Sequence, residues 1–180
     1  VRWGADITCF SGDKLVGGPQ AGLIVGQADL IRKIRKNPFF RALRVDKIVL
    51  AMLEHLFEVY LDGEWSSRIP LYQLLSVSES DLYSRGKAIL KKSGNPPGLS
   101  LEATEAFVGG GAMPQHQIPS VGIVFGTEYR ARLLLKLFRD ATPPIIGRIE
   151  NDQLILDLRS VTESEDRFLT KAICSVSDRA

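Results

Sequence analysis

Short apolar runs and helically spaced apolar residues alternate through the first third of the chain. Glycines lie beside two of the runs, which therefore predict strands, and apolar positions at every third or fourth residue predict a longer helix. A shorter basic helix should end at Asn37-Pro38, because the residue before proline avoids the helical conformation, and Asp46 is suited to cap the longer helix. The elements expected here are strands at residues 6–10 and 21–25 and helices at residues 28–36 and 46–60.

The remainder of the chain carries helix and strand patterns in a different order. The stretch NPPG at residues 95–98 breaks the pattern, Asn151-Asp152 is a hairpin signal, and Thr162 with Glu165 forms a capping box. The elements expected are helices at residues 78–92, from 127 or 128 to about 140 and after 162, with strands at residues 99–108, 120–125, 145–150 and 154–158. This order predicts a small α+β domain with helices on one face of a largely antiparallel sheet.

Composition narrows the functional classes. A chain of 180 residues with 44% hydrophobic and 24% charged residues is an ordinary globular protein, and its net charge of +2 excludes bulk attraction to nucleic acid or membranes. Cys9 and Cys174 have no disulfide or zinc spacing, so we expect a reducing, cytoplasmic compartment and no membrane span. The chain begins at Val1, close to an expected strand, and we expect it to be a fragment.

One glycine-rich loop, FSGDKLVGGPQAG at residues 10–22, has the composition of an anion site built around a lysine. It matches neither the Walker A order nor the GxGxxG order. The Lys14 amine can form a Schiff base with an aldehyde cofactor, with Ser11 and the backbone at Gly12 near the cofactor's phosphate. Asp13 can orient the amine, although a carboxylate favours its charged form. A surface turn with a solvated lysine is the alternative, which the residues alone favour.

Two arginines are a second candidate site. Arg41 and Arg44 are three positions apart, so on a helix their guanidinium groups would share one face, which Lys47 would extend. Two guanidinium groups on one face can bind a tetrahedral oxyanion through charge-assisted hydrogen bonds. A solvated basic face is the alternative, and spacing alone favours it.

Several longer stretches together resemble one enzyme family. In order along the chain they are FSGDKLVGGPQAGLIVG, NPFFRALRVDK, VGGGAMP with IPS, and PPIIGRIENDQLILDLR. They are similar to bacterial selenocysteine synthase, the L-seryl-tRNA(Sec) selenium transferase, a pyridoxal phosphate (PLP) enzyme of the aspartate-aminotransferase fold (fold type I). The resemblance implies an α/β fold class, with residues 1–68 as the end of the PLP-binding large domain with its connecting helix. Residues 69–180 would form the small C-terminal α+β domain, since the composition changes near residues 62–70.

The resemblance also implies roles for the candidate residues. Lys14 would carry PLP and move a proton at the substrate's α-carbon, Asp13 would orient Lys14, and Arg41 and Arg44 would bind the phosphate of the selenium donor. Ser11 and Gly12 would contact the cofactor. Seryl-tRNA(Sec) would lose its serine hydroxyl to give a dehydroalanyl intermediate, to which selenium from selenophosphate would add. The complete enzyme would be a homo-oligomer built from dimers.

The same comparison limits what this chain should do alone. Upstream cofactor-binding residues and an N-terminal tRNA-binding domain are expected outside it, so we expect an incomplete enzyme. Two alternatives stay open: a paralogous PLP lyase acting on a small amino acid or amino sugar phosphate, and a non-catalytic assembly fragment.

The histidines and the charged residues near the last expected hairpin are expected to have structural roles. His55 should lie near the apolar stripe of its helix, and neither it nor His116 has a second ligand at metal spacing, so we assign no metal. The remaining charged candidates are expected to form structural pairs: Arg148 and Arg159, with Glu150 and Asp157.

Overall fold

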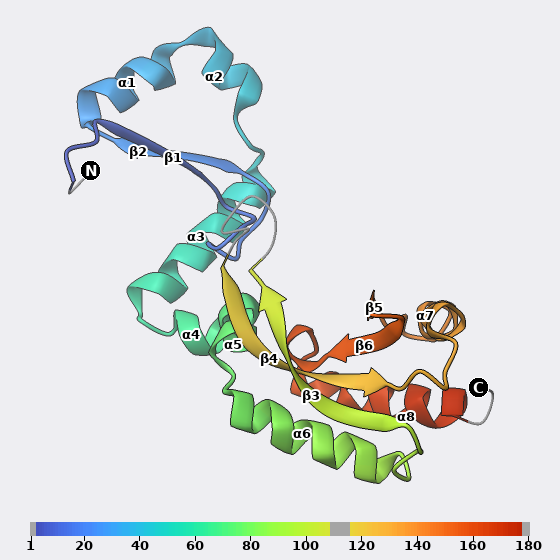
Figure 1. Cartoon of the computed structure of the whole chain (residues 1–180). Coiled ribbons are helices and arrows are strands. Elements are labelled where there is room, and N and C mark those ends of the chain that lie inside the picture. Colours follow the sequence, from blue (N-terminus) through green and yellow to red (C-terminus); the bar gives the residue numbers. More distant parts are fainter. Residues whose placement is uncertain (1–2, 109–115, 178–180) are drawn as a thin grey trace. The chain divides into compact units, whose positions relative to one another are not determined.

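The computed structural model describes residues 3–108 and 116–177, and the chain divides into two compact units, Val1–Gln73 and Leu74–Ala180 (Figure 1). We call these the N-terminal and the C-terminal unit. The division falls inside a short helix, a few residues after the boundary expected from the sequence. Apart from Val108, the VGGGAMP stretch lies outside the described residues.

The N-terminal unit consists of a strand pair followed by helices. Its described elements are β1 (Ile7–Ser11), β2 (Gly22–Gly26), α1 (Ala28–Lys36), α2 (Pro38–Leu43), α3 (Lys47–Leu61), α4 (Trp65–Arg68) and α5 (Pro70–Ser76), which runs past the boundary. β1 and β2 are antiparallel, and Phe10 lies opposite Leu23. The strands at the start of the chain and the helices α1 and α3 are confirmed, whereas α2, α4 and α5 were not predicted.

Side-chain caps fix where the helices of this unit begin. The Asn37 side chain accepts a hydrogen bond from the Phe39 N–H at 2.9 Å, and proline at the first helical position starts α2. Asp46 accepts from the Val49 N–H at 2.9 Å and caps α3 as expected. The core of the unit forms around α3, which supplies Leu53, Leu56 and Val59. Ala21, just before β2, and Ile69, just after α4, complete its buried apolar residues.

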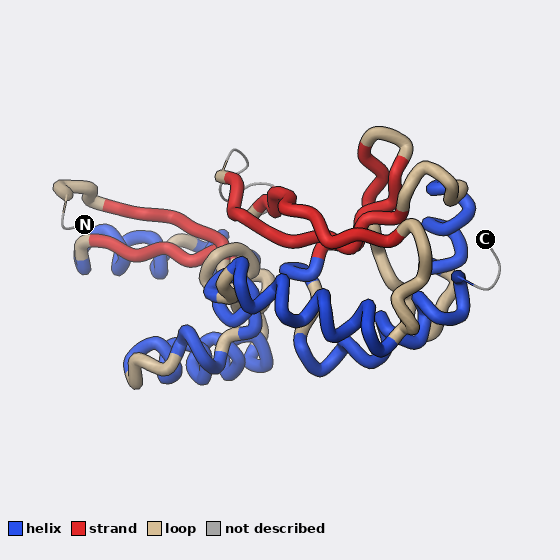
Figure 2. Tube along the Cα trace, turned by 60° about the horizontal axis from the view of Figure 1, so that its bottom comes forward, coloured by secondary structure: helices blue, strands red, loops and turns tan. Residues whose placement is uncertain are grey.

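The C-terminal unit is built on an antiparallel sheet. Its described strands are β3 (Leu99–Phe107), β4 (Gln117–Phe125), β5 (Arg148–Glu150) and β6 (Gln153–Asp157), in the order β3-β4-β6-β5. Its helices are α6 (Glu79–Lys92), α7 (Ala131–Arg139) and α8 (Asp166–Ser177), with short 3₁₀ turns η1 (Leu158–Ser160) and η2 (Glu163–Glu165). Figure 2 shows α6 and α8 on one side of this sheet.

Local signals explain most of this unit. The hairpin between β5 and β6 turns at Asn151 (φ 49°) and Asp152 (φ 60°), the left-handed conformation that two-residue hairpin turns require. The Thr162 N–H and hydroxyl donate to the Glu165 carboxylate at 2.9 and 2.7 Å, so the expected capping box is present. α7 begins only at Ala131, later than expected.

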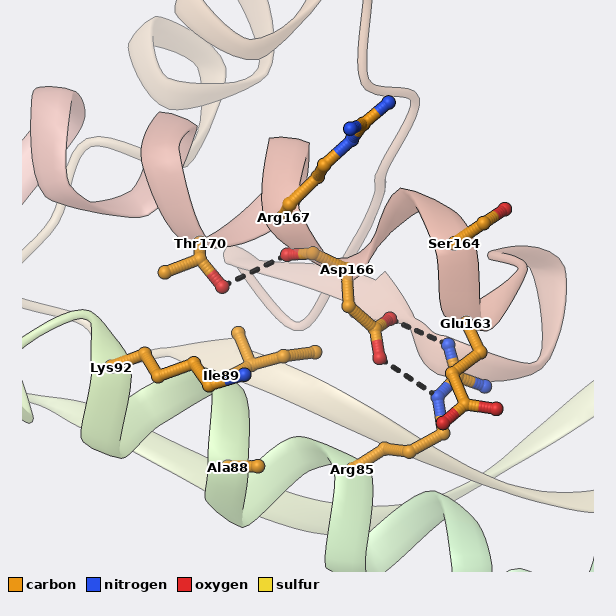
Figure 3. A pocket seen from close by; sticks show the side chains of 9 residues that line it. All are labelled: Arg85, Ala88, Ile89, Lys92, Glu163, Ser164, Asp166, Arg167 and Thr170. Atoms are coloured by element: carbon orange, nitrogen blue, oxygen red, sulfur yellow. Dashed lines mark hydrogen bonds and ion pairs between the residues drawn. The ribbon is translucent and has the colours of Figure 1, made fainter.

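The core of the C-terminal unit lies between its sheet and its helices. Phe125 of β4 and Phe138 of α7 are fully buried and pack edge to face, with ring centroids 5.5 Å apart. An ion pair joins α6 to α8: the Arg85 guanidinium donates to the Asp166 carboxylate at 2.6 and 3.1 Å (Figure 3). The shallow pocket beside this pair, about 430 Å³, is lined by residues of both signs of charge, including Lys92 and Glu163.

The charged residues of the last hairpin are structural. Arg148 donates to the Glu150 and Asp157 carboxylates at 2.5 and 2.9 Å, as expected. Arg159 does not pair with the Asp157 carboxylate through its guanidinium, which instead donates to backbone carbonyls. His55, which the sequence placed near the apolar stripe of its helix, has a side chain that is 68% exposed.

Candidate functional site

The lysine loop connects β1 to β2 and is closed by its own backbone. The Gly12 N–H donates to the Ala21 carbonyl at 2.8 Å, and the Gly18 N–H donates to the Gly12 carbonyl at 2.8 Å. A turn of four residues follows Asp13, in which the Gly17 N–H donates to the Lys14 carbonyl at 2.9 Å. The loop is therefore an ordered structure.

Three glycines in this loop are needed for close packing. A Cβ atom on Gly12 would lie 2.7 Å from the Pro19 carbonyl oxygen, and one on Gly18 would lie 2.5 Å from Leu56 of α3. Gly17 has a φ of +75°, which side chains rarely adopt. The N–H groups of all three donate within the loop. The glycines thus let the backbone approach itself and α3, and these three N–H groups are already used.

Lys14 and Asp13 form an ion pair at the tip of the loop. The Lys14 Nζ and Asp13 Oδ2 atoms are 2.7 Å apart, and the two side chains are 45% and 28% exposed. The hydrogen bond from Lys14 is the main reason that the pKa of Asp13 lies below its ordinary value. An accessible amine thus stands beside a carboxylate that stays ionised.

Sequence reasoning missed two residues that contact this loop. Tyr60 of α3 and Tyr72 of α5 donate hydrogen bonds to the carbonyls of Val16 and Leu15, each at 2.8 Å. No local pattern signals these contacts, because the partners are 44 and 57 positions apart.

A groove of about 1370 Å³ lies beside the loop within the N-terminal unit and is lined by β1, β2, α1, α2 and the start of α3. Ser11 and Arg44 both line it, with Lys33 and Arg35. Its lining residues include three cations and no carboxylate, and the rest is mostly apolar. The groove therefore suits a ligand that carries negative charge.

The two candidate arginines lie at the C-terminal end of α2. α2 ends at Leu43, and Arg44 is an extended residue (φ −63°, ψ 142°) whose N–H closes the last turn on the Phe40 carbonyl. The N–H and φ of Arg44 continue the helical pattern and only its ψ departs, whereas Lys47 belongs to the next helix. Arg44 lines the groove, whereas Arg41 is not among its lining residues. Both side chains are exposed.

The described part of the chain offers neither a metal site nor a membrane span. Residues 3–108 and 116–177 contain no cluster of three or more His, Cys, Asp or Glu residues that could hold a metal ion. No helix within these residues is long and apolar enough to span a membrane.

Most of the chain is similar in sequence to one enzyme family. A family described as L-seryl-tRNA selenium transferase matches residues 1–162. The L-seryl-tRNA(Sec) selenium transferase of Campylobacter concisus is 41% identical over 173 residues, which cover 96% of this chain and 38% of the relative. The protein of the same name from Desulfotalea psychrophila is 39% identical over 171 residues, which cover 92% of this chain and 37% of the relative. The chain thus spans somewhat more than a third of the length of these relatives.

A solved structure shows the fold. The structure of D-glucosaminate-6-phosphate ammonia-lyase aligns with all of this chain and 46% of its own, with a TM-score of 0.67 and 21% sequence identity. The α/β fold class expected from the sequence is confirmed.

Proposed function

The chain belongs to the L-seryl-tRNA selenium transferase family, and we propose that it is the part of such an enzyme that carries the cofactor-binding lysine, Lys14. The reaction proposed for the complete enzyme is the conversion of seryl-tRNA(Sec) to selenocysteinyl-tRNA(Sec) with selenophosphate. One observation carries the proposal: the Lys14 amine is 45% exposed on a loop whose backbone is hydrogen-bonded on both sides of it.

The residues of the loop fit PLP, the cofactor proposed for this site. An aldehyde requires an accessible primary amine, which Lys14 supplies, and Asp13 lies within hydrogen-bond distance to orient that amine. Ser11 is exposed and lines the neighbouring groove, where its hydroxyl can donate to a phosphate oxygen. Gly12 would contribute by its lack of a side chain, because its N–H already donates to Ala21.

Each residue of the loop then has a proposed part in the reaction. Bound PLP supplies an electron sink that makes the α-proton of an attached amino acid acidic. Lys14 would take that proton and return it, because its amine stays within reach of the α-carbon. Asp13 would keep the amine directed, and its lowered pKa means that it stays a carboxylate at neutral pH.

The groove supports a site for the phosphate of the selenium donor. Ser11, the last residue of β1 before the lysine loop, and Arg44 line one groove, which therefore offers a hydroxyl and a guanidinium group to a ligand. We propose that Arg44 binds this phosphate, and that Arg41 completes the site from α2. Lys33 and Arg35 on the same groove would add attraction for the phosphates of the tRNA end.

Location and assembly complete the proposal. Cys9 and Cys174 are both free and exposed, which fits a reducing compartment, and we propose the cytoplasm. Exposed apolar side chains in the N-terminal unit, such as Phe39 (74%) and Leu43 (79%), support assembly into a homo-oligomer built from dimers.

A chimera tests the proposed function. We would replace the matching part of the Campylobacter concisus relative with this chain, add PLP, reduce with borohydride and map the labelled peptide. The expected result is a visible absorption band and a label on Lys14, both lost in Lys14→Ala. Lys87→Ala, which removes an exposed lysine of α6, is the matched control. It should change neither the absorption band nor the label on Lys14.

The same chimera separates the alternatives. Transfer of selenium to seryl-tRNA(Sec) would support the transferase. Release of ammonia from a small amino acid, without transfer to tRNA, would favour a lyase. Labelling spread over many lysines, or none at Lys14, would leave only an assembly role.

A further inference from the structure

Two tyrosine hydroxyls hold the backbone directly after Lys14. Tyr60 donates to the Val16 carbonyl and Tyr72 donates to the Leu15 carbonyl, each at 2.8 Å. Each hydroxyl proton is thereby committed to a carbonyl. The two hydroxyl oxygens lie 3.4 Å apart, so the two contacts form one polar cluster under the loop.

The ring packing keeps both hydroxyls in place. Tyr60 and Tyr72 meet edge to face with centroids 6.3 Å apart, and Trp65 packs on Tyr72 at 4.9 Å. Both tyrosines are half-buried. Burial, followed by the contact with Tyr72, raises the pKa of Tyr60, so its hydroxyl remains a neutral donor throughout the physiological range.

These contacts act on the turn that carries Lys14. The turn is closed by the Gly17 N–H on the Lys14 carbonyl, and Leu15 and Val16 are its two central residues. Rotation of either central peptide unit would move a carbonyl away from its tyrosine. The start of the turn, where the Lys14 side chain leaves the backbone, is therefore fixed from the α3 and α5 side.

We propose that Tyr60 and Tyr72 are positioning residues that set the direction of the Lys14 amine toward the cofactor's aldehyde. The inference rests on the proposed function, since it concerns the same lysine. It predicts that loss of the hydroxyls changes the reactivity of Lys14 while the rings, and hence the core, remain.

The test uses Tyr60→Phe, Tyr72→Phe and the double variant. Tyr129→Phe is the matched control, because it also removes a hydroxyl bonded to a carbonyl, that of Pro97 at 2.6 Å, but in the C-terminal unit. Hydrogen exchange on this chain would report the amides of Gly17 and Gly18. The chimera described above, with PLP, would report the rate of Lys14 labelling and the pH midpoint of the visible band.

Amide exchange at Gly17 and Gly18 should be roughly 5- to 30-fold faster in the double variant, as for one or two lost hydrogen bonds. Lys14 labelling should slow at least about fivefold and the pH midpoint should shift, with no change in Tyr129→Phe. Unchanged exchange would overturn the inference, as would faster exchange with wild-type labelling and midpoint. Failure of the unsubstituted chimera to label Lys14 would instead refute the proposed function, and this inference with it.

Discussion

Arg159 is a buried charged residue whose removal should strongly weaken the C-terminal unit. Its side chain is buried, with 6% of the residue exposed, and its guanidinium donates five hydrogen bonds of 2.6–3.3 Å to backbone carbonyls. The acceptors are Leu74 and Leu75 in the last turn of α5, Val77 directly after it, and Pro119 on β4. A cation at a helix C-terminus is also favoured by the helix dipole.

The expected loss for Arg159→Ala follows from these contacts. Four carbonyls lose their charged donor, and each unsatisfied carbonyl costs about 1 kcal/mol, the low end of the usual range, because water can enter the vacated space. The free energy of unfolding should therefore fall by about 4 kcal/mol, a large part of a typical domain stability of about 5–15 kcal/mol. Arg159→Lys keeps the charge but not the fork, and should lose roughly half as much.

Hydrogen exchange measures this loss locally, which suits a chain of two units that need not unfold together. Amides of Gln117–Phe125 in β4 should exchange about a thousandfold faster in Arg159→Ala. Arg132→Ala on α7 removes an exposed arginine and should remain close to wild type. If Arg159→Ala exchanges within about tenfold of that control, the guanidinium does not sustain these carbonyls and the reasoning is refuted.

Three further changes test other parts of the structure. Gly12→Ala places a Cβ 2.7 Å from the Pro19 carbonyl oxygen, so the lysine loop should lose about 1–3 kcal/mol, visible as faster amide exchange confined to the loop. Asp166→Asn removes the charge of the ion pair between α6 and α8 and should lower the free energy of unfolding by about 1–3 kcal/mol, measured by denaturant titration. Contacts with Thr162 lower the pKa of Glu165 below its ordinary 4.5. The stability that the ionised Glu165 contributes is therefore complete above pH 4.5, and it is lost as pH falls through the lower pKa of the folded state. Glu165→Gln can keep the capping box but removes this exposed charge at the helix start, so it should reduce the melting temperature at neutral pH by the equivalent of only about 0.3 kcal/mol, and hardly at all in stronger acid.

Local chemistry made part of the fold predictable. Asp46 accepts from a main-chain N–H at the start of α3, and Asn151-Asp152 turns a hairpin, because both effects depend on a few neighbouring residues. The short helices α2, α4 and α5 escaped prediction, since four to seven residues are too few to show a period. The sequence pattern likewise did not show that α2 ends at Leu43, one residue before Arg44.

The candidate site was predictable only in its chemistry. Lys14, Asp13 and Ser11 stand out by residue type and by resemblance, and the structure places Lys14 and Asp13 in contact. The role of the loop glycines was not visible, because their N–H groups bond within the loop and their missing Cβ atoms make room for Pro19 and α3. Tyr60 and Tyr72 approach the loop only through the tertiary fold.

The contacts that hold the lysine loop in place differ from those that would cover the strands β1 and β2 on either side of it. The loop is held by its own backbone, by two tyrosines and by α3, all inside the N-terminal unit. The strand pair beside it exposes apolar side chains on both faces, with Phe10 (37% exposed) on one and Ile24 (44%) on the other. Strands with two apolar faces are typical of a sheet covered on both sides, and a strand pair alone is marginally stable. We therefore expect that covering these faces in a longer protein stabilises β1 and β2, while the turn after Lys14 keeps its hydrogen bonds to Tyr60 and Tyr72 without that covering.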